Sequence, residues 1–241
     1  GRSHPVCSFR VAIDRKMKKL ILLTGPSTAG KTTLIRALGH AMPEAHILIQ
    51  SACREPRKDD DPRFIKSYSR SEFDGLDFWV HYGQFGIAND DIRSFVEGPA
   101  EVAFSVSGVR EVAQAKSIQD SRLTVGTILV RMSADAEKER QLVRDGIVGH
   151  FKDPAVRLEQ NERLLNEFFL NANFIHGNID LTLSREMPLS SWIQTVATTF
   201  GITHLLDGSI AHASDQALEE NAHFRATPHG AVADVLEIGR K

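Results

Sequence analysis

The sequence predicts an α/β fold in which a mostly parallel sheet is flanked by helices, and two observations indicate it. Short apolar runs suited to buried parallel strands recur along the chain. Stretches with helical spacing separate several of these runs, and this alternation is typical of a parallel sheet with helices on both faces. The expected strands are Leu20–Leu23, Ala45–Ile49, Val102–Val106, Thr127–Val130 and Phe174–Ile175. The expected helices are Thr32–Ala41, Gly108–Ala115, Ala134–Arg144 and Ala155–Phe169.

A glycine-rich segment, GPSTAGKTT at residues 25–33, joins the first expected strand to the first expected helix. It fits the pattern G-x-x-x-x-G-K-[ST]. The glycines allow successive N–H groups to point inward, and the helix N-terminus adds positive potential, so the segment suits the phosphates of a nucleoside triphosphate. The Lys31 ammonium can reach the β- and γ-phosphates, and the Thr32 hydroxyl can ligate Mg²⁺. We therefore predict a P-loop NTPase fold, with a nucleotide site at Gly25, Ser27, Thr28, Ala29, Gly30, Lys31, Thr32 and Thr33.

Composition excludes several classes of protein. The chain has 241 residues, of which 41% are hydrophobic, enough for one domain with appendages. Its 29 Lys and Arg against 31 Asp and Glu give a net charge of −2, which does not favour nucleic-acid binding. Cys7 and Cys53 have neither metal-ligand nor disulfide-framework spacing. No apolar run approaches the ~20 residues that a membrane span needs. We expect a soluble, cytoplasmic protein without nucleic-acid or membrane partners; no oligomeric state is predicted.

Three segments are expected along the chain. Residues 1–16 are interpreted as an N-terminal extension, because Met17 and two lysines lead directly into the first strand. Residues 17–200 form the P-loop domain. Its last helix is expected to begin at Pro188 and to pack the side chains Trp192, Val196 and Phe200 on the core. Residues 201–241 contain few large apolar side chains and are interpreted as a C-terminal tail with a short helix.

Arginines follow the loop in segments with predicted structure. Arg54 and Arg57 come after the first helix, Arg140 and Arg144 share one helical face, and Arg157 begins another helical run. Guanidinium forks match phosphate oxygens, and phosphoryl transfer depends mainly on positioning and charge neutralisation. The sequence has no Asn-Lys-x-Asp segment of the kind by which GTPases read their base. None of the later strands ends in the acidic pair of motor ATPases. These features favour a kinase.

The motifs resemble those of the guanylate kinase family over about residues 18–200. GPSTAGKTTL is similar to the family's opening loop, and Arg54-Glu55-Pro56-Arg57 matches its Arg-x-Pro-Arg segment. Further segments that resemble the family are Ser69–Phe73 (Ser-x-x-Glu-Phe), Phe85-Gly86 (Tyr-Gly), Ser133–Gly146 (Ser-x-Glu…Arg…Arg-Gly), Arg157-Leu158 (the next lid arginine) and Phe174–Asn178 (a strand ending in Asn near the adenine).

This resemblance implies an ATP- and Mg²⁺-dependent kinase acting on a small phosphorylated substrate. It implies an acceptor-binding lobe at about residues 50–90 and a lid at about 133–157. Lys31, Arg140, Arg144 and Arg157 would neutralise the transferring phosphoryl group. Arg54 and Arg57 would hold the acceptor phosphate with Phe85 at the same substrate site, Asn178 would lie near the ATP base, and Thr32 would be the metal ligand.

Three departures from the family leave the acceptor open. Residues 58–65 replace a Gly-Glu-x-x-Gly-x-Asp-Tyr segment, Phe78 replaces a guanine-reading acid, and Phe104–Gly108 replaces Asp-x-Asp-x-x-Gly. Val106–Arg110 is similar to the Val-Asn-Gly-Ser-Arg of ribosyl bisphosphate kinases, which need no guanine-reading acid. The sequence therefore favours GMP or another nucleoside monophosphate as acceptor, with ribose 1,5-bisphosphate as the rival. A guanylate kinase-like module that binds nucleotide without catalysis is a further alternative, and a regulatory switch is the least favoured.

Overall fold

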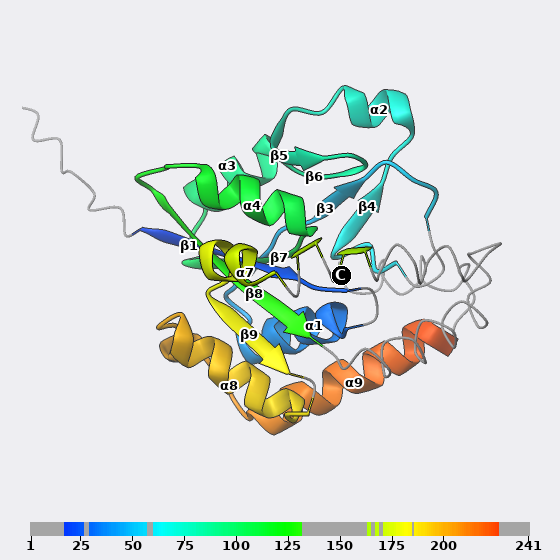
Figure 1. The fold of residues 1–241 in the computed structure, drawn as a ribbon. Helices are drawn as coiled ribbons and strands as arrows, with labels where there is room; N and C mark the ends of the chain where they lie inside the picture. The colour runs from blue at the N-terminus through cyan, green and yellow to red at the C-terminus, as the bar shows by residue number, and fades with distance from the viewer. Residues whose placement is uncertain are drawn as a thin grey trace, which may run out of the picture.

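The molecule is built on a parallel sheet of five strands in the order β2-β7-β1-β8-β9 (Figure 1). The computed structural model describes residues 17–26, 29–56, 60–131, 163–164, 167–168, 171–184 and 186–226. The strands are β1 (Lys18–Thr24), β2 (His46–Ile47), β7 (Val102–Val106), β8 (Leu123–Arg131) and β9 (Leu181–Ser184). Each neighbouring pair in this sheet is parallel. The predicted α/β class with a mostly parallel sheet is confirmed.

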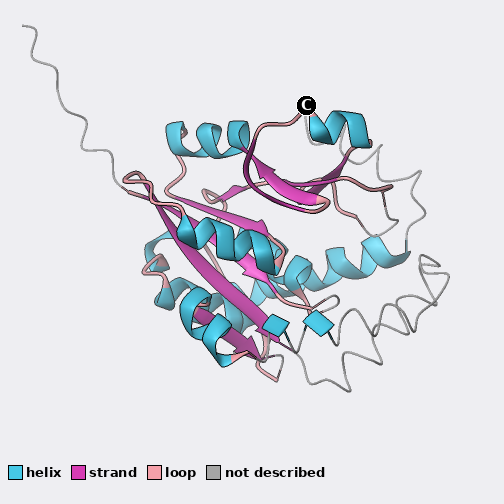
Figure 2. Ribbon diagram, turned by 45° about the horizontal axis from the view of Figure 1, so that its top comes forward, coloured by secondary structure: helices cyan, strands magenta, loops and turns pink. Residues whose placement is uncertain are grey.

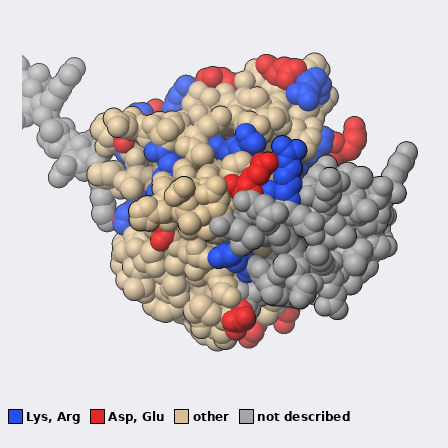
Figure 3. All heavy atoms as spheres, viewed as in Figure 1, with Lys and Arg blue, Asp and Glu red and all other residues tan. Residues whose placement is uncertain are grey.

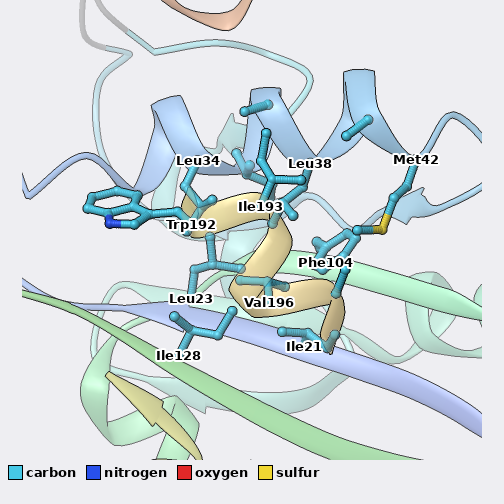
Figure 4. Packing of buried hydrophobic residues seen from close by; sticks show 14 of the residues in the cluster. Ile21, Leu23, Leu34, Leu38, Met42, Phe104, Ile128, Trp192, Ile193 and Val196 are labelled. Atoms are coloured by element: carbon cyan, nitrogen blue, oxygen red, sulfur yellow. The ribbon is translucent and has the colours of Figure 1, made fainter. Parts of the chain in front are cut away.

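Helices cover both faces of this sheet, because the side chains of β1 alternate between two apolar layers (Figure 2). Ile21 and Leu23 pack in one cluster, against α1 (Lys31–Ala41), α8 (Leu189–Thr199) and α9 (Ile210–Ala226). Leu20 and Leu22 pack in the other cluster, with α3 (Asn89–Glu97) and α4 (Val109–Ser117). Figure 4 shows the first layer, in which Trp192 and Val196 of α8 lie between α1 and the sheet. The strand that leads into the P-loop is therefore central, and it is buried from Leu20 to Thr24.

A second, smaller sheet lies within residues 50–88, to the right of α3 and α4 in Figure 1. Its order is β4-β3-β6-β5, with β3 (Gln50–Ala52), β4 (Ile65–Ser67), β5 (Phe78–Tyr82) and β6 (Phe85–Ala88). Strands β5 and β6 form a hairpin whose turn places Gly83 at φ 62°. The short helix α2 (Arg70–Asp74) begins in a capping box between Ser69 and Glu72.

The expected strand at Phe174–Ile175 is wrong, because these residues lie in helix α7 (Ala172–Asn178). The Asn171 side chain caps this helix by accepting a hydrogen bond from Phe174 N at 3.1 Å, and Phe174 packs edge-on against Phe168. The fifth strand is instead β9, in which Leu183 is buried. A pair of apolar residues such as Phe174 and Ile175 is compatible with either a strand or a short helix, so the sequence pattern alone could not distinguish them.

The other expected strands and helices that fall within the described residues are present, although most of their bounds differ from the predicted ones. The helix expected to begin at Pro188 is α8, with Pro188 as its N-cap. The strand expected at Ala45–Ile49 is only two residues long. The helix expected at Ala134–Arg144, and most of the one expected at Ala155–Phe169, lie outside the described residues.

The C-terminal segment contributes to the core through α9. This helix is 17 residues long, where the sequence suggested a short one, and its buried Ala213 and Ala217 pack in the same cluster as α1. Small side chains on this face allow close approach of two helices. A short 3₁₀ helix, η2 (Thr203–Leu205), precedes it. Among the helices of the described residues, none has the length and apolar content to cross a bilayer.

The packing of α1 gives a first prediction. Leu38 is 0% exposed, whereas Leu218 of α9 is 51% exposed. Leu38→Ala should reduce the free energy of unfolding by about 2–5 kcal/mol, because it leaves a cavity between α1 and the sheet. Leu218→Ala is the matched control and should change it by less than about 0.5 kcal/mol. Urea unfolding curves measure both, and equal effects would contradict the described layer.

Candidate active site

Two glycines, Gly25 and Gly30, shape the loop after β1. Any other residue at these positions would strain the backbone. Gly25 has φ 143°, and a Cβ added there would lie 2.3 Å from the carbonyl oxygen of Val130 in β8. Gly30, the N-cap of α1, has φ 105°. Both φ values lie in the region that favours glycine. The loop therefore curls tightly against the carboxyl end of β8 and leads directly into α1.

The N-terminus of α1 is prepared for an anion. Lys31 is its first residue, Thr32 and Thr33 follow, and the first turn carries no acidic residue that would oppose the helix dipole. The Lys31 ammonium donates to Gly25 O at 2.8 Å and to Pro26 O at 2.6 Å, so it folds back over the loop. Of the predicted nucleotide-site residues, the structure brings together Gly25, Ala29, Gly30, Lys31, Thr32 and Thr33; Ser27 and Thr28 lie outside the described residues.

A carboxylate that the sequence analysis missed is buried next to the carboxyl end of β7. Glu111, in the first turn of α4, is 3% exposed, and its Oε1 has no hydrogen-bond partner among the described residues. Its carboxylate packs on Gly108, where an added Cβ would lie 2.2 Å from Oε2. Burial raises the pKa of Glu111 to about 7. The sequence does contain a signal for this site, because Glu111 is an acid in the first turn of the helix that follows β7. A search for acids at the strand ends does not detect it.

Two hydroxyl groups at the same edge of the sheet are also buried without a hydrogen-bond partner among the described residues. Thr24 ends β1, and Ser107, which follows β7, donates its N–H to Leu23 O at 2.9 Å. The carboxyl edge of a parallel sheet is where such folds bind ligands. With Glu111, these groups supply hard oxygen donors of the type that Mg²⁺ prefers, so the donor set fits this ion.

Arg54, predicted to hold the acceptor phosphate, lies two residues beyond β3 and is engaged by a carboxylate. Its Nη1 and Nη2 donate to the two oxygens of Asp60, each at 2.7 Å, and Nη1 also donates to Glu55 O at 3.0 Å. Phe85 pairs with Ala52 in the neighbouring strand, so the structure brings Phe85 and Arg54 to the same part of the small sheet. Arg57 lies outside the described residues.

The loop beside Asp60 is tied to α1 and α9 by a buried ionic network. Asp61 accepts hydrogen bonds from Arg36 Nη2 of α1 at 3.0 Å and from Arg63 Nη2 at 2.8 Å. Glu220 of α9 accepts from Arg63 Nη2 at 2.7 Å and contacts His40 Nε2 at 2.7 Å. The Arg36 and Asp61 side chains are only 2% and 1% exposed. The loop at Asp61–Arg63 is therefore fixed to α1, the helix that follows the P-loop.

The Phe174–Asn178 segment lies beside the middle of β8, where Asn178 contacts Thr127. The Asn178 amide donates to Phe174 O at 2.9 Å within α7, and Asn178 O accepts from Thr127 Oγ1 at 2.5 Å. An open concavity of about 640 Å³ beside it is lined by Arg131, Ala172, Asn173, Ile175 and His176. Because Arg131 follows Val130, against which Gly25 packs, this concavity adjoins the P-loop. Arg140, Arg144 and Arg157 lie outside the described residues.

The surface charge is mixed on the face shown in Figure 3. Lys and Arg side chains alternate with Asp and Glu there, and no continuous basic surface crosses the described residues in that view. This distribution agrees with the net charge of −2.

The sequence is similar over part of its length to curated guanylate kinases. The chain is 28% identical over 136 residues to guanylate kinase of Rubrobacter xylanophilus, covering 52% of this chain and 68% of that protein. It is 34% identical over 59 residues to guanylate kinase of Nocardia farcinica, covering 24% of this chain and 31% of that protein. No family model matches the sequence. The protein is thus guanylate kinase-like in sequence.

The fold comparison includes a guanylate kinase as well. The crystal structure of guanylate kinase from Anaplasma phagocytophilum is 10% identical, with a TM-score of 0.47, and the match covers 83% of this chain and 95% of that one. The α/β assignment rests on the strand order and register described above.

The Arg36–Asp61–Arg63 network predicts a loss of stability in acid. Burial alone would raise the pKa of Asp61, but hydrogen bonds and charge from Arg63, together with the hydrogen bond from Arg36, outweigh it and hold that pKa below its ordinary value. A carboxyl group with a lowered folded-state pKa stabilises the fold above its unfolded pKa of about 4 and loses this contribution as the pH falls further.

Asp61→Asn should therefore reduce the free energy of unfolding at pH 7 by about 3 kcal/mol, because Arg36 keeps a buried charge without its counterion. The difference in free energy of unfolding between Asp61→Asn and the wild type should narrow as the pH falls from about 4 through the lowered folded-state pKa of Asp61. Asp74→Asn, which breaks an exposed pair with Arg70, is the control and should have little effect. Parallel pH profiles for the wild type and Asp61→Asn in urea unfolding would contradict this account.

Proposed function

We propose that this protein is an ATP-dependent kinase that transfers a phosphoryl group to a phosphorylated small molecule, with GMP as the leading acceptor. The observation that carries the proposal is the curl at Gly25 and Gly30 that places Lys31 at the N-terminus of α1. Such an arrangement of N–H groups, helix dipole and ammonium suits the β- and γ-phosphates of a nucleotide. The similarity to guanylate kinases supports a kinase over other P-loop classes. The cytoplasm, where ATP is abundant, is the compartment that this activity implies.

Each residue has a proposed part in the transfer. The loop backbone would hold the triphosphate while the Lys31 ammonium moves from Gly25 O and Pro26 O onto the phosphate oxygens. Arg54 and Arg57 would hold the acceptor phosphate. The further arginines Arg140, Arg144 and Arg157 would neutralise the transferring phosphoryl group. Thr32 and Glu111 would hold Mg²⁺, which supplies charge neutralisation for the phosphate oxygens. The concavity at Arg131 and His176, near Asn178, would receive the nucleoside of ATP.

A second acceptor, ribose 1,5-bisphosphate, is favoured by the surroundings of Phe78. This residue, which stands where guanylate kinases place a guanine-reading acid, packs against Phe73 at 4.7 Å between ring centroids and stacks on His81 at 4.9 Å. A Cβ added at Gly86 would lie 2.6 Å from the Phe78 ring. The position therefore holds an aromatic cluster without a carboxylate, and guanine would lose a hydrogen-bond partner there.

Turnover tests the proposed function directly. ADP release should be observed with at least one acceptor among GMP, other nucleoside monophosphates and ribose 1,5-bisphosphate. Lys31→Ala should abolish it while the fold remains, because the ammonium is the charge that meets the transferring phosphate. Arg93→Ala, which removes an exposed cation of α3, is the control and should retain activity. Mg²⁺-dependent ATP binding without turnover on any acceptor would instead indicate a non-catalytic binding module.

The part proposed for Glu111 is measurable without turnover. In Glu111→Gln, the Mg²⁺ concentration that half-saturates binding of a non-hydrolysable ATP analogue should rise about tenfold, the usual scale for losing a group that supports a metal site. Calorimetric titration of the analogue at several Mg²⁺ concentrations gives this value. An unchanged Mg²⁺ requirement, with a gain in stability from removing a buried unpaired carboxylate, would assign Glu111 a structural role only.

A further inference from the structure

The guanidinium proposed to bind the acceptor phosphate is already held by a carboxylate of the same chain. Arg54 and Asp60 meet fork to fork, through Nη1–Oδ2 and Nη2–Oδ1 contacts of 2.7 Å each. Their side chains are only 11% and 15% exposed. Paired, charge-assisted hydrogen bonds of this kind are stronger than those of a solvated surface pair.

This contact uses the donors that an incoming phosphate needs. Arginine has five N–H donors, and its terminal Nη1 and Nη2 present a fork to two oxygens of an anion. Asp60 occupies that fork, and Glu55 O takes a further hydrogen bond from Nη1. Nε is covered from solvent and has no hydrogen-bond partner among the described residues. In this arrangement a phosphate gains the fork only when the Asp60 carboxylate leaves it.

The main chain next to Asp60 is anchored independently of Arg54. The following residue, Asp61, is bonded through its side chain to Arg36 and Arg63, and its carbonyl oxygen accepts from Phe64 N at 2.9 Å and Ile65 N at 3.1 Å. None of these bonds involves Arg54. Release of the fork therefore calls for a change in the Asp60 side chain and leaves the anchored loop in place.

We propose that Asp60 is an internal competitor for the Arg54 guanidinium and that it sets the anion specificity of the acceptor site. The inference rests on the proposed function, in which Arg54 binds the acceptor phosphate. A carboxylate carries one negative charge and two oxygens, whereas a phosphate monoester at pH 7 carries close to two charges and three oxygens. The phosphate outcompetes Asp60, and a ligand that offers only a carboxylate does not. Asp60 thus restricts the site to phosphorylated acceptors.

The opposite role, in which Asp60 orients Arg54 for the ligand, predicts the opposite result and provides the test. Inorganic phosphate serves as the probe, with the P-loop first saturated by Mg²⁺ and a non-hydrolysable ATP analogue. Asp60→Asn should bind phosphate about tenfold more tightly than the wild type, the scale of a hydrogen bond to a charged group. It should also bind acetate measurably, where the wild type does not. With an acceptor that turns over, the KM for the acceptor should fall and kcat should stay unchanged.

Weaker or unchanged phosphate binding by Asp60→Asn would overturn the inference, and weaker binding that Asp60→Glu restores would identify a positioning residue. Asp60→Ala repeats the test with a smaller side chain in case the amide disturbs folding. Asp74→Asn, on α2 of the same lobe, is the matched control and should bind phosphate as the wild type does, because its partner Arg70 lies on the surface.

The variant Arg54→Ala separates this inference from the proposed function. Loss of phosphate binding in Arg54→Ala, with no gain in Asp60→Asn, would remove the competitor role and keep Arg54 as the acceptor ligand. Wild-type phosphate binding in Arg54→Ala would remove the proposed acceptor site itself, and the competitor role with it.

Discussion

The close approach of Gly25 to the backbone of β8 is the constraint on which the rest of the site depends. With its Cβ position 2.3 Å from Val130 O, this residue has room for a hydrogen only. The loop therefore lies directly on the parallel pair β1–β8, and Gly30 then turns the chain into α1. The position of Lys31 is thus set by main-chain geometry, which a rigid central sheet maintains.

A single helix then connects the two halves of the site. The N-terminus of α1 faces the phosphate loop, and five residues later Arg36 anchors the acceptor loop through Asp61, about 8 Å along the helix axis. Leu34, Ile35 and Leu38 fix the opposite side of α1 in the core. Glu220 joins α9 to this arrangement through Arg63 and His40. Any displacement of the Asp61 loop relative to α1 must strain these buried ionic contacts. In the proposed function they would restrain the distance between nucleotide and acceptor.

Local signals in the sequence were enough to predict the strand, loop and helix at the P-loop and the helix after Pro188. They failed at Phe174–Ile175, where the Asn171 cap decides the structure, and at α9, whose burial depends on its fit to α1. The pairing of Arg36 with Asp61 and with Glu220 joins residues too far apart in the sequence for spacing to reveal. Glu111 was missed for a related reason, since burial without a partner is a property of the packed molecule alone.

The small sheet and the loop beside it differ from the guanylate kinase pattern in where their acidic residues lie. Where guanylate kinases read a base with carboxylates, this chain has Phe78 packed on Phe73 and His81, a surface with little capacity to select a polar ring by hydrogen bonds. Its acids lie instead at Asp60 and Asp61, against arginines. If Arg54 binds the acceptor as we propose, selection would shift from the base to the phosphate, because the Arg54 fork would be the strongest contact for that ligand. A site that selects by charge needs a device that rejects weaker anions, and the Asp60 carboxylate on the Arg54 fork would supply one.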